Sequence, residues 1–244
     1  MISVQQYSVT LGDFQLKDIS LDIGDREIFA LIGRTGSGKS VLLESLAGFY
    51  NTYGGNVLYN GISVSGIPLE QRRIGYVYQN YCLFPHMNVL DNVEFGLRMH
   101  KVPKKQRRET ALNMLQSLGI EHLADRRPDT LSGGEQQRCA LARALVLEPE
   151  ILFMDEPFSA LDPNTRKDMY RLIRSIHENY ACTIVFVTHD FREAAELADR
   201  VGIIIHGSLK EICPADQLFL PHEDEEVNAF VHGRSPEPPA AMTA

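Results

Sequence analysis

Residues 33–40, Gly-Arg-Thr-Gly-Ser-Gly-Lys-Ser, have the types and spacing of a loop that binds phosphate groups. The glycines let successive backbone N–H groups turn towards one anion. The pattern G-x-x-x-x-G-K-[ST] between a strand and a helix is typical of nucleotide-binding loops; the alternative is a turn that only caps a helix. Because a helix dipole contributes only about 0.3–2 kcal/mol, we expect Lys39 to supply full charge to the β- and γ-phosphates and Ser40 to bind Mg²⁺. The predicted phosphate site comprises Gly33, Arg34, Thr35, Gly36, Ser37, Gly38, Lys39 and Ser40.

Two adjacent carboxylates follow the apolar run at residues 151–154. A carboxylate just past a buried strand is a suitable Mg²⁺ ligand, directly or through water, so we assign this role to Asp155. Its neighbour Glu156 is placed to act as general base towards an attacking water. Alone, the pair could be solvated loop residues. In combination with the phosphate loop, the metal and base roles are favoured.

A histidine and a glutamine follow two further apolar runs. His189 lies at the end of "IVFVTHD", and Gln79 follows "RIGYVY", which we interpret as another strand. Ligand sites in open α/β sheets lie where the carboxyl ends of strands meet. We therefore expect both side chains near Asp155, with Gln79 in contact with metal or water. The alternative for a lone histidine in this position is a structural role.

The sequence "TLSGGEQQRCALARAL" at residues 130–145 begins like a capped helix. Ser132 is a preferred N-cap, and Glu135 three residues later completes a capping box. Gly133 and Gly134 are unfavourable in a first helical turn, by about 1 kcal/mol each relative to alanine, which predicts a bare helix end that receives an anion. Because one phosphate loop already exists in the chain, we expect this helix start to close over the nucleotide of a second copy.

The composition is that of an ordinary globular protein, with 44% hydrophobic and 23% charged residues among 244. The net charge of −8 argues against a nucleic-acid partner, because nucleic-acid footprints are normally basic. No secretory signal is visible, and the longest apolar runs are far shorter than the ~20 residues of a membrane helix. We therefore expect a cytoplasmic chain that does not itself cross a membrane. The four cysteines lack metal or redox spacing and are expected as buried, reduced thiols.

Apolar runs at residues 26–33, 150–157 and 182–190 predict buried strands, and the helical patterns between them favour an α/β fold. From residue 80 onwards helix signals dominate, including one helix opened by Pro103 with a stripe of Leu112, Leu115 and Leu118. These observations predict three parts: an α/β core of residues 1–79 and 148–213, a helical insertion of residues 80–147, and an acidic, Pro/Ala-rich tail of residues 214–244 with a disordered end.

Six motifs together resemble those of ABC-transporter ATPase subunits, over about residues 1–215. They are a Walker A (33–40), a Q-loop (Gln79), a signature ("LSGGEQQR"), a Walker B (151–156), a D-loop ("SALD", 159–162) and a switch histidine (His189). The resemblance implies a P-loop NTPase (RecA-like) core with a mixed sheet and an inserted helical subdomain.

The same resemblance implies how the motifs act. ATP with Mg²⁺ lies between two copies of the chain, each of which supplies one Walker A and one signature. The implied catalytic residues are Glu156, His189 and Gln79, and the implied metal site comprises Ser40, Gln79 and Asp155. Hydrolysis drives integral membrane permease subunits, which places the chain peripherally at the cytoplasmic face of the membrane.

Two residue assignments within this resemblance stay open. Asp162 of the D-loop is expected to reach the nucleotide of the partner, and it is also a good N-cap for a helix that starts at Pro163. For stacking on adenine, Phe14 is the first choice by its position relative to the first strands, and Tyr7 is the second. Either aromatic residue is alternatively part of the core.

Residues 76–99 resemble the ATPase subunits of molybdate and tungstate importers. This implies a groove that receives a helix of the membrane subunit, formed in part by Leu83, Phe84, Pro85, His86 and Met87; the alternative is ordinary core. The cargo is then read by a separate substrate-binding protein. Sulfate, polyamine and ferric-iron importers remain alternatives. Since 39 residues follow residue 205, we expect no C-terminal regulatory domain.

A function from a different class is a soluble ABC ATPase that acts in DNA repair or on ribosomes. The acidic charge balance, a single ATPase unit and the lack of a long coiled-coil pattern argue against it.

Overall fold

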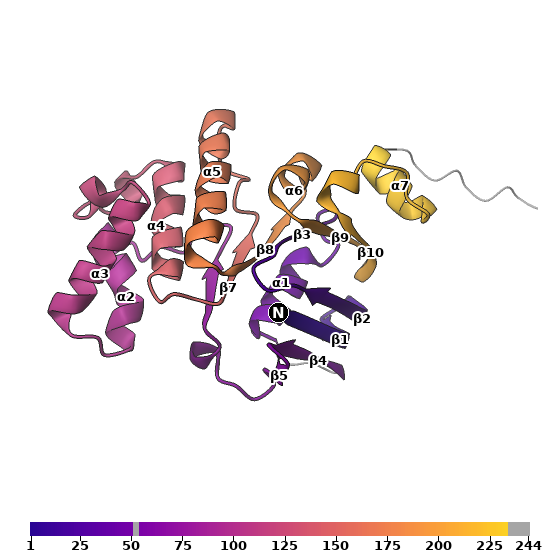
Figure 1. The fold of residues 1–244 in the computed structure, drawn as a ribbon, viewed down its shortest axis with the longest axis horizontal. Coiled ribbons are helices and arrows are strands. Elements are labelled where there is room, and N and C mark those ends of the chain that lie inside the picture. The colour runs from indigo at the N-terminus through magenta and orange to yellow at the C-terminus, as the bar shows by residue number, and fades with distance from the viewer. Residues whose placement is uncertain (51–53, 234–244) are drawn as a thin grey trace, which may run out of the picture.

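The computed structural model describes residues 1–50 and 54–233, which form two β-sheets with flanking helices (Figure 1). The strands are β1 (Ile2–Leu11), β2 (Phe14–Ile23), β3 (Ile28–Ile32), β4 (Gly54–Tyr59), β5 (Ile62–Ser63), β6 (Ile74–Val77), β7 (Ile151–Asp155), β8 (Thr183–Thr188), β9 (Arg200–Ile205) and β10 (Ser208–Pro214). The α-helices are α1 (Lys39–Ala47), α2 (Val89–Met99), α3 (Lys104–Ser117), α4 (Gly133–Leu145), α5 (Pro163–Tyr180), α6 (Phe191–Leu197) and α7 (Glu225–His232).

The larger sheet has the strand order β10-β9-β3-β8-β7-β6. Its strands from β9 to β6 pair in parallel, and β10 pairs antiparallel with β9. Every residue of β3, β7 and β8 is buried, as expected for parallel strands that are covered on both faces. The predicted α/β fold with a mixed sheet is therefore confirmed.

A second, antiparallel sheet of order β2-β1-β4-β5 covers one face of the larger sheet together with α1. The sequence did not indicate that these strands form a sheet of their own. Residues of β3 alternate between two cores: Phe29 and Leu31 pack towards the second sheet, and Ala30 and Ile32 pack towards the helices on the other face.

Helices α2, α3 and α4 pack on one another and form the left-hand part of the molecule in Figure 1. Pro103 directly precedes α3, as the sequence suggested. The buried residues of α3 are Ala111, Met114 and Leu115, whereas Leu112 is only partly buried. Leu115 and Leu118 of the predicted stripe are buried in the core, Leu118 directly after the helix, and Leu112 packs against the same core. Ala111 and Met114 complete the buried face, since alanine and methionine also fill core positions.

The segment after β10 contributes to the core. Leu218 and Val227, the latter in α7, are fully buried. The Pro/Ala-rich end of the tail, for which we expected disorder, lies outside the described residues. Three cysteines are buried and unpaired as expected, but Cys82 is exposed.

In the part of the chain that the structure describes, no helix combines the length and apolar character needed to cross a membrane.

Phe186 in β8 gives a test of how much core packing contributes to the free energy of unfolding. Its side chain is fully buried, and its ring meets Phe158 edge-on with 6.0 Å between the centroids. We expect Phe186→Ala to lower the free energy of unfolding by about 3–5 kcal/mol, because apolar transfer energy is lost and a cavity remains. The matched control Phe219→Ala, at a side chain that is 50% exposed, should change it by about 0.5 kcal/mol or less. Equal losses in urea unfolding would contradict the packing described here.

Candidate active site

The carboxyl ends of four parallel strands lie side by side at one edge of the larger sheet. β3 pairs with β8, β8 with β7 and β7 with β6, each without a register shift. The residues that follow these strands therefore share this edge: Gly33 after β3, His189 after β8, Glu156 after β7 and Gln79 after β6.

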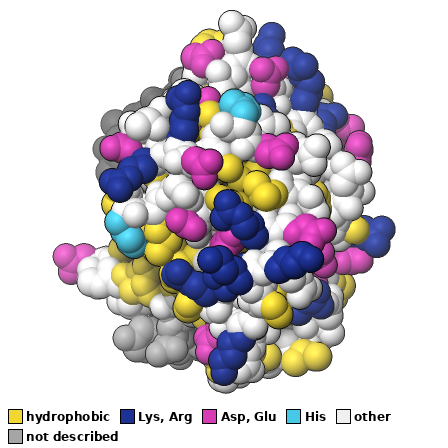
Figure 2. Space-filling view, turned by 90° about the vertical axis from the view of Figure 1, so that its left-hand side faces the viewer, with side chains coloured by type: hydrophobic (Ala, Val, Ile, Leu, Met, Phe, Trp, Pro, Cys, Tyr) yellow, Lys and Arg dark blue, Asp and Glu magenta, His cyan; other side chains and the backbone are white. Residues whose placement is uncertain are grey.

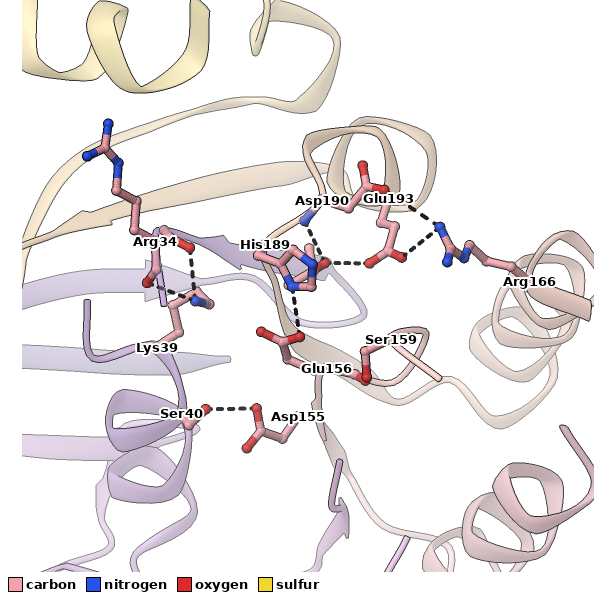
Figure 3. A network of polar contacts seen from close by, with 12 residues as sticks. Arg34, Lys39, Ser40, Asp155, Glu156, Ser159, Arg166, His189, Asp190 and Glu193 are labelled. Atoms are coloured by element: carbon pink, nitrogen blue, oxygen red, sulfur yellow. Dashed lines mark hydrogen bonds and ion pairs between the residues drawn. The ribbon is translucent and has the colours of Figure 1, made fainter. Parts of the chain in front are cut away.

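The phosphate loop connects β3 to α1, and its lysine folds back onto it (Figure 3). Lys39 is buried, and its Nζ donates to the carbonyl oxygens of Gly33 at 2.9 Å and Arg34 at 3.2 Å. Burial lowers the pKa of Lys39, while the nearby Glu156 and Asp155 carboxylates oppose this shift. An ammonium group held by carbonyl oxygens alone keeps its charge available for an anion.

The backbone of this loop fits a bound phosphate. Gly36 and Gly38 have φ angles of +80° and +104°, which favour glycine. The Ser37 hydroxyl is buried and has no hydrogen-bond partner. A Cβ at Gly33 would lie 2.4 Å from this hydroxyl oxygen and equally close to the Ile204 carbonyl. A buried hydroxyl without a partner is costly, and a phosphate oxygen in the loop would satisfy it.

Ser40 and Asp155 form the pair to which we assigned Mg²⁺. The Ser40 hydroxyl donates to Asp155 Oδ1 at 2.9 Å. Burial raises the pKa of Asp155, and the bond from Ser40 opposes this shift. Hydroxyl and carboxylate oxygens are the ligands that Mg²⁺ prefers. Two such ligands fit an ion whose other ligands are phosphate oxygens and water. Within the described residues no group of three or more His, Cys, Asp or Glu side chains could hold a metal.

Glu156 and His189 are in direct contact. His189 Nδ1 lies 2.8 Å from Glu156 Oε2, and the histidine side chain is 57% exposed against 16% for the glutamate. Glu156 has a φ of +43°, a conformation that is unusual for a residue with a side chain and frequent at active sites. Its backbone N–H donates to the Val187 carbonyl at 3.1 Å and its carbonyl accepts from the Ser159 hydroxyl at 3.0 Å. These bonds hold the carboxylate at the edge of the sheet.

The remaining predicted residues of this pocket differ in their surroundings. Gln79 is exposed just past β6. Phe14 packs against the phosphate loop, since a Cβ at Gly38 would meet the Phe14 ring at 2.5 Å. Tyr7 is fully buried, and its hydroxyl has no hydrogen-bond partner among the described residues. Phe14 therefore lies at the phosphate loop, and Tyr7 lies in the core.

The start of α4 has the predicted capping box. The Ser132 hydroxyl accepts from the Glu135 N–H at 3.4 Å, and the Glu135 carboxylate accepts from the Ser132 N–H at 2.7 Å. The bonds that the Ser132 N–H and the Ser132 hydroxyl donate to the Glu135 carboxylate lower the pKa of Glu135. In Figure 1, α4 lies in the helical group and apart from α1, where the phosphate loop ends. The neighbours found for Ser132, Gly133 and Gly134 are Glu135, Ala160 and Thr165, none of which belongs to the phosphate loop.

Asp162 caps α5, as its alternative interpretation predicted. Its carboxylate accepts from the N–H groups of Asn164 at 3.0 Å and Thr165 at 3.2 Å, and Pro163 is the first helical residue. The start of α4 touches this turn. A Cβ at Gly134 would lie 2.7 Å from Thr165 Cγ2, whereas at Gly133 the nearest atom would be 3.9 Å away. A residue without a side chain is therefore needed at position 134 for α4 to pack against α5, which the sequence did not indicate.

A buried charge lies next to the loop of His189, and no motif in the sequence indicated it. Glu193 in α6 is 4% exposed and accepts a hydrogen bond from the Thr188 hydroxyl. Arg166 in α5 faces it at 3.8 Å. The available signal was a charged residue on each apolar helix face, with Glu193 beside Ala194 and Arg166 one turn before Met169.

Comparison with known proteins places this geometry in a family. Residues 16–159 match the family model described as ABC transporter. The chain belongs to the ABC transporter family. It is 44% identical over 231 residues to the molybdate/tungstate import ATP-binding protein WtpC of Pyrococcus horikoshii, which covers 95% of this chain and 67% of that protein. It is 42% identical over 223 residues to the sulfate/thiosulfate import ATP-binding protein CysA of Methylococcus capsulatus, covering 89% and 64%.

Solved structures of ABC cassettes share the fold. The dimeric structure of the ATP-binding cassette MJ0796 in a post-hydrolysis state, bound to ADP and Pi, matches with a TM-score of 0.78 and 30% identity over 88% of this chain and 99% of that one. The P-loop NTPase fold that the motifs implied is thereby confirmed.

The contact between α4 and α5 gives a test for the ABC signature glycines. In Gly134→Ala, the new methyl group overlaps Thr165 Cγ2, and overpacking costs about 1–3 kcal/mol, offset by about 1 kcal/mol from better helix propensity. Thr165→Ser removes Cγ2 but keeps the hydroxyl. We therefore expect the effects of the two changes on the free energy of unfolding, measured in urea, to be non-additive by about 0.5–3 kcal/mol. The double variant should be more stable than the sum of the two single effects predicts.

Gly133→Ala is the matched control, because its methyl group would make only an ordinary van der Waals contact, 3.9 Å from the Ala160 carbonyl oxygen. It should show no coupling to Thr165→Ser. Additive effects for Gly134→Ala would show that the glycine is not required by this contact.

Proposed function

We propose that this chain is the ATP-hydrolysing subunit of an ABC importer and acts on ATP with Mg²⁺. The observation that carries the proposal is the convergence, at one sheet edge, of the Walker A loop, the Ser40–Asp155 pair and the Glu156–His189 pair. Phosphate binding, metal binding and water activation are the three tasks of phosphoryl transfer to water, and each has a group here.

Each side chain has a role that follows from its surroundings. Lys39 and the loop N–H groups bind and orient the β- and γ-phosphates. Glu156 accepts a proton from the attacking water, and His189 holds the Glu156 carboxylate in place at 2.8 Å. Ser40 and Asp155 would hold Mg²⁺, which supplies charge compensation for the phosphates when bound, with Gln79 at the same edge. Phe14, at the loop, is the proposed contact for adenine.

A second copy of the chain completes this site. The Ser132–Gly134 helix start lies apart from the phosphate loop of the same chain, and its N–H groups suit a phosphate. Head-to-tail pairing brings it, together with Asp162, over the nucleotide of the partner. The dimeric state and the bound ADP and Pi of the MJ0796 cassette support this arrangement.

The segment at residues 83–87 is the proposed contact for a permease. Asn92 is fully buried and holds this segment by accepting from the Phe84 N–H at 2.8 Å and donating to the Phe84 carbonyl at 3.2 Å. The Phe84 ring packs at a tilt against the Phe95 ring, with 4.6 Å between the centroids, while Pro85 and His86 are exposed. Leu83 and Met87 are partly buried. A rigid loop with apolar side chains at the surface suits the helix of a membrane subunit.

Molybdate or tungstate is the proposed cargo, because an importer ATPase named for these oxyanions is 44% identical over 95% of the chain. The 42% identity to a sulfate/thiosulfate import protein favours sulfate as the second candidate. The cargo would be selected by a substrate-binding protein outside the membrane, while this chain stays at the cytoplasmic face.

The helical end of the molecule does not favour a nucleic-acid partner. Figure 2 shows Lys and Arg side chains on the helical end of the molecule, interspersed with Asp, Glu and hydrophobic groups. Some of this positive charge is paired, since Glu94 lies 2.8 Å from Arg107 and 3.9 Å from Arg108. A mixed surface of this kind lacks the continuous positive stripe that tracks a phosphate backbone.

Glu156→Gln tests the catalytic assignment. Binding remains but water activation is lost, so we expect ATP hydrolysis to fall by about 10²–10⁴-fold and a stable dimer to form with ATP and Mg²⁺. Turnover and light-scattering mass on the same sample check this. Lys39→Ala, as the control, should lose nucleotide binding in calorimetry and stay monomeric. A monomeric Glu156→Gln chain that hydrolyses ATP at the normal rate would refute the role of Glu156.

Cargo is tested by uptake in cells that depend on this chain. Strains with the wild-type chain should accumulate tungsten and molybdenum above strains with Lys39→Ala, as measured by elemental mass spectrometry. Sulfate uptake, followed with ³⁵S in the same pair, should be equal. The reverse result would assign the chain to a sulfate importer, and co-purification with nucleic acid instead of a permease would reject transport.

A further inference from the structure

A network of polar contacts joins α5 to the loop that carries His189 (Figure 3). Arg166, in the first turn of α5, directs Nη1 to Glu193 Oε1 at 3.8 Å and to Asp190 Oδ2 at 3.7 Å. Its Nη2 donates to the Leu161 carbonyl at 3.2 Å. One guanidinium group therefore touches both the D-loop and the start of α6.

Glu193 extends this contact to His189. The Thr188 hydroxyl donates to Glu193 Oε2 and accepts from the Asp190 N–H at 3.0 Å. Thr188 and Asp190 are the chain neighbours of His189, so these bonds define the backbone from which its imidazole reaches Glu156 at 2.8 Å.

A buried carboxylate requires compensation. The Glu193 side chain is 5% exposed, and an ionised group at this depth is unfavourable without a nearby cation and hydrogen bonds. Burial raises the pKa of Glu193, and the Thr188 hydroxyl and Arg166 oppose this shift. Arg166 is thus the cation that compensates the buried Glu193 carboxylate, beside the hydrogen bond from Thr188.

We propose that Arg166 is a positioning residue for ATP hydrolysis. It holds Glu193, which bonds to Thr188, so that His189 keeps its contact with Glu156. Its bond to the Leu161 carbonyl connects this contact to the D-loop. The proposal rests on the proposed hydrolytic role of Glu156. Arg166 acts through its neighbours and does not contact the nucleotide. A shift of the Leu161–Asp162 segment, which faces the second copy, is thereby transmitted to His189.

The test compares substitutions on one helix of the full chain. Arg166→Met removes the positive charge together with the contacts to Glu193, Asp190 and the Leu161 carbonyl. Arg166→Lys keeps the charge but not the geometry of the guanidinium group. Arg171→Met is the matched control, because Arg171 lies on α5 in an exposed ion pair with Asp168 at 2.9 Å. Steady-state ATPase assays give kcat, calorimetry gives the Kd for ATP, and the ¹⁵N-histidine NMR signal of His189, assigned with His189→Gln, reports the imidazole.

We expect Arg166→Met to lower kcat at least tenfold, to leave the Kd within twofold and to shift the His189 signal. Arg166→Lys should lie between it and the wild type. Arg171→Met should match the wild type in all three. Adding Glu193→Gln to Arg166→Met should cost less than a further twofold in kcat, because both changes remove the same brace.

Three results would overturn the proposal: an Arg166→Met chain that behaves like Arg171→Met, an unshifted His189 signal despite lower kcat, or a loss that multiplies in the double variant. If Arg166→Met does not fold, Arg166→Lys with wild-type kcat and His189 signal overturns it as well. A wild-type chain without ATPase activity would refute the proposed function instead, while the NMR comparison would still decide whether Arg166 positions His189.

Discussion

Parallel pairing of β3, β8, β7 and β6 is the constraint on which the site depends. Parallel strands all end at the same edge, so the loops that follow them meet there although they are far apart in the chain. Ser40 and Asp155 are 115 positions apart and 2.9 Å apart in space. The complete burial of β3, β7 and β8 between two cores keeps this edge rigid, and rigid placement is what phosphoryl transfer requires of a protein.

That edge carries charged groups at depths where charge is unfavourable. Lys39, Asp155 and Glu193 are all largely buried. Burial favours the neutral form of each group, so it lowers the pKa of Lys39 and raises the pKa of Asp155 and of Glu193. The compensation differs. Glu193 has the Thr188 hydroxyl and Arg166 as partners, whereas Lys39 has carbonyl oxygens as hydrogen-bond acceptors and the Asp155 and Glu156 carboxylates nearby. The Ser37 hydroxyl has no hydrogen-bond partner among the described residues. The incomplete compensation at the phosphate loop is consistent with a site for an anion and a cation.

Two helix starts form a second packed unit next to this edge. The first turns of α4 and α5 are in contact through Gly134 and Thr165, and each is capped by a side chain, Ser132 and Asp162. The signature and the D-loop are therefore parts of one packed unit. Arg166 connects that unit to the loop of His189, which gives a physical route between the surface proposed to face the second copy and the proposed catalytic pair.

The sequence by itself determined the features that depend on neighbouring residues. These are the phosphate loop, the capping box at Ser132, the cap of α5 at Asp162 and the buried strands, because spacing and local hydrogen bonding specify them. Only the tertiary structure decided the second sheet, the contact of Gly134 with Thr165 and the chain of contacts from Arg166 to His189. Such contacts join residues tens to more than a hundred positions apart. Their existence depends on how elements pack, and no short pattern in the chain encodes that packing.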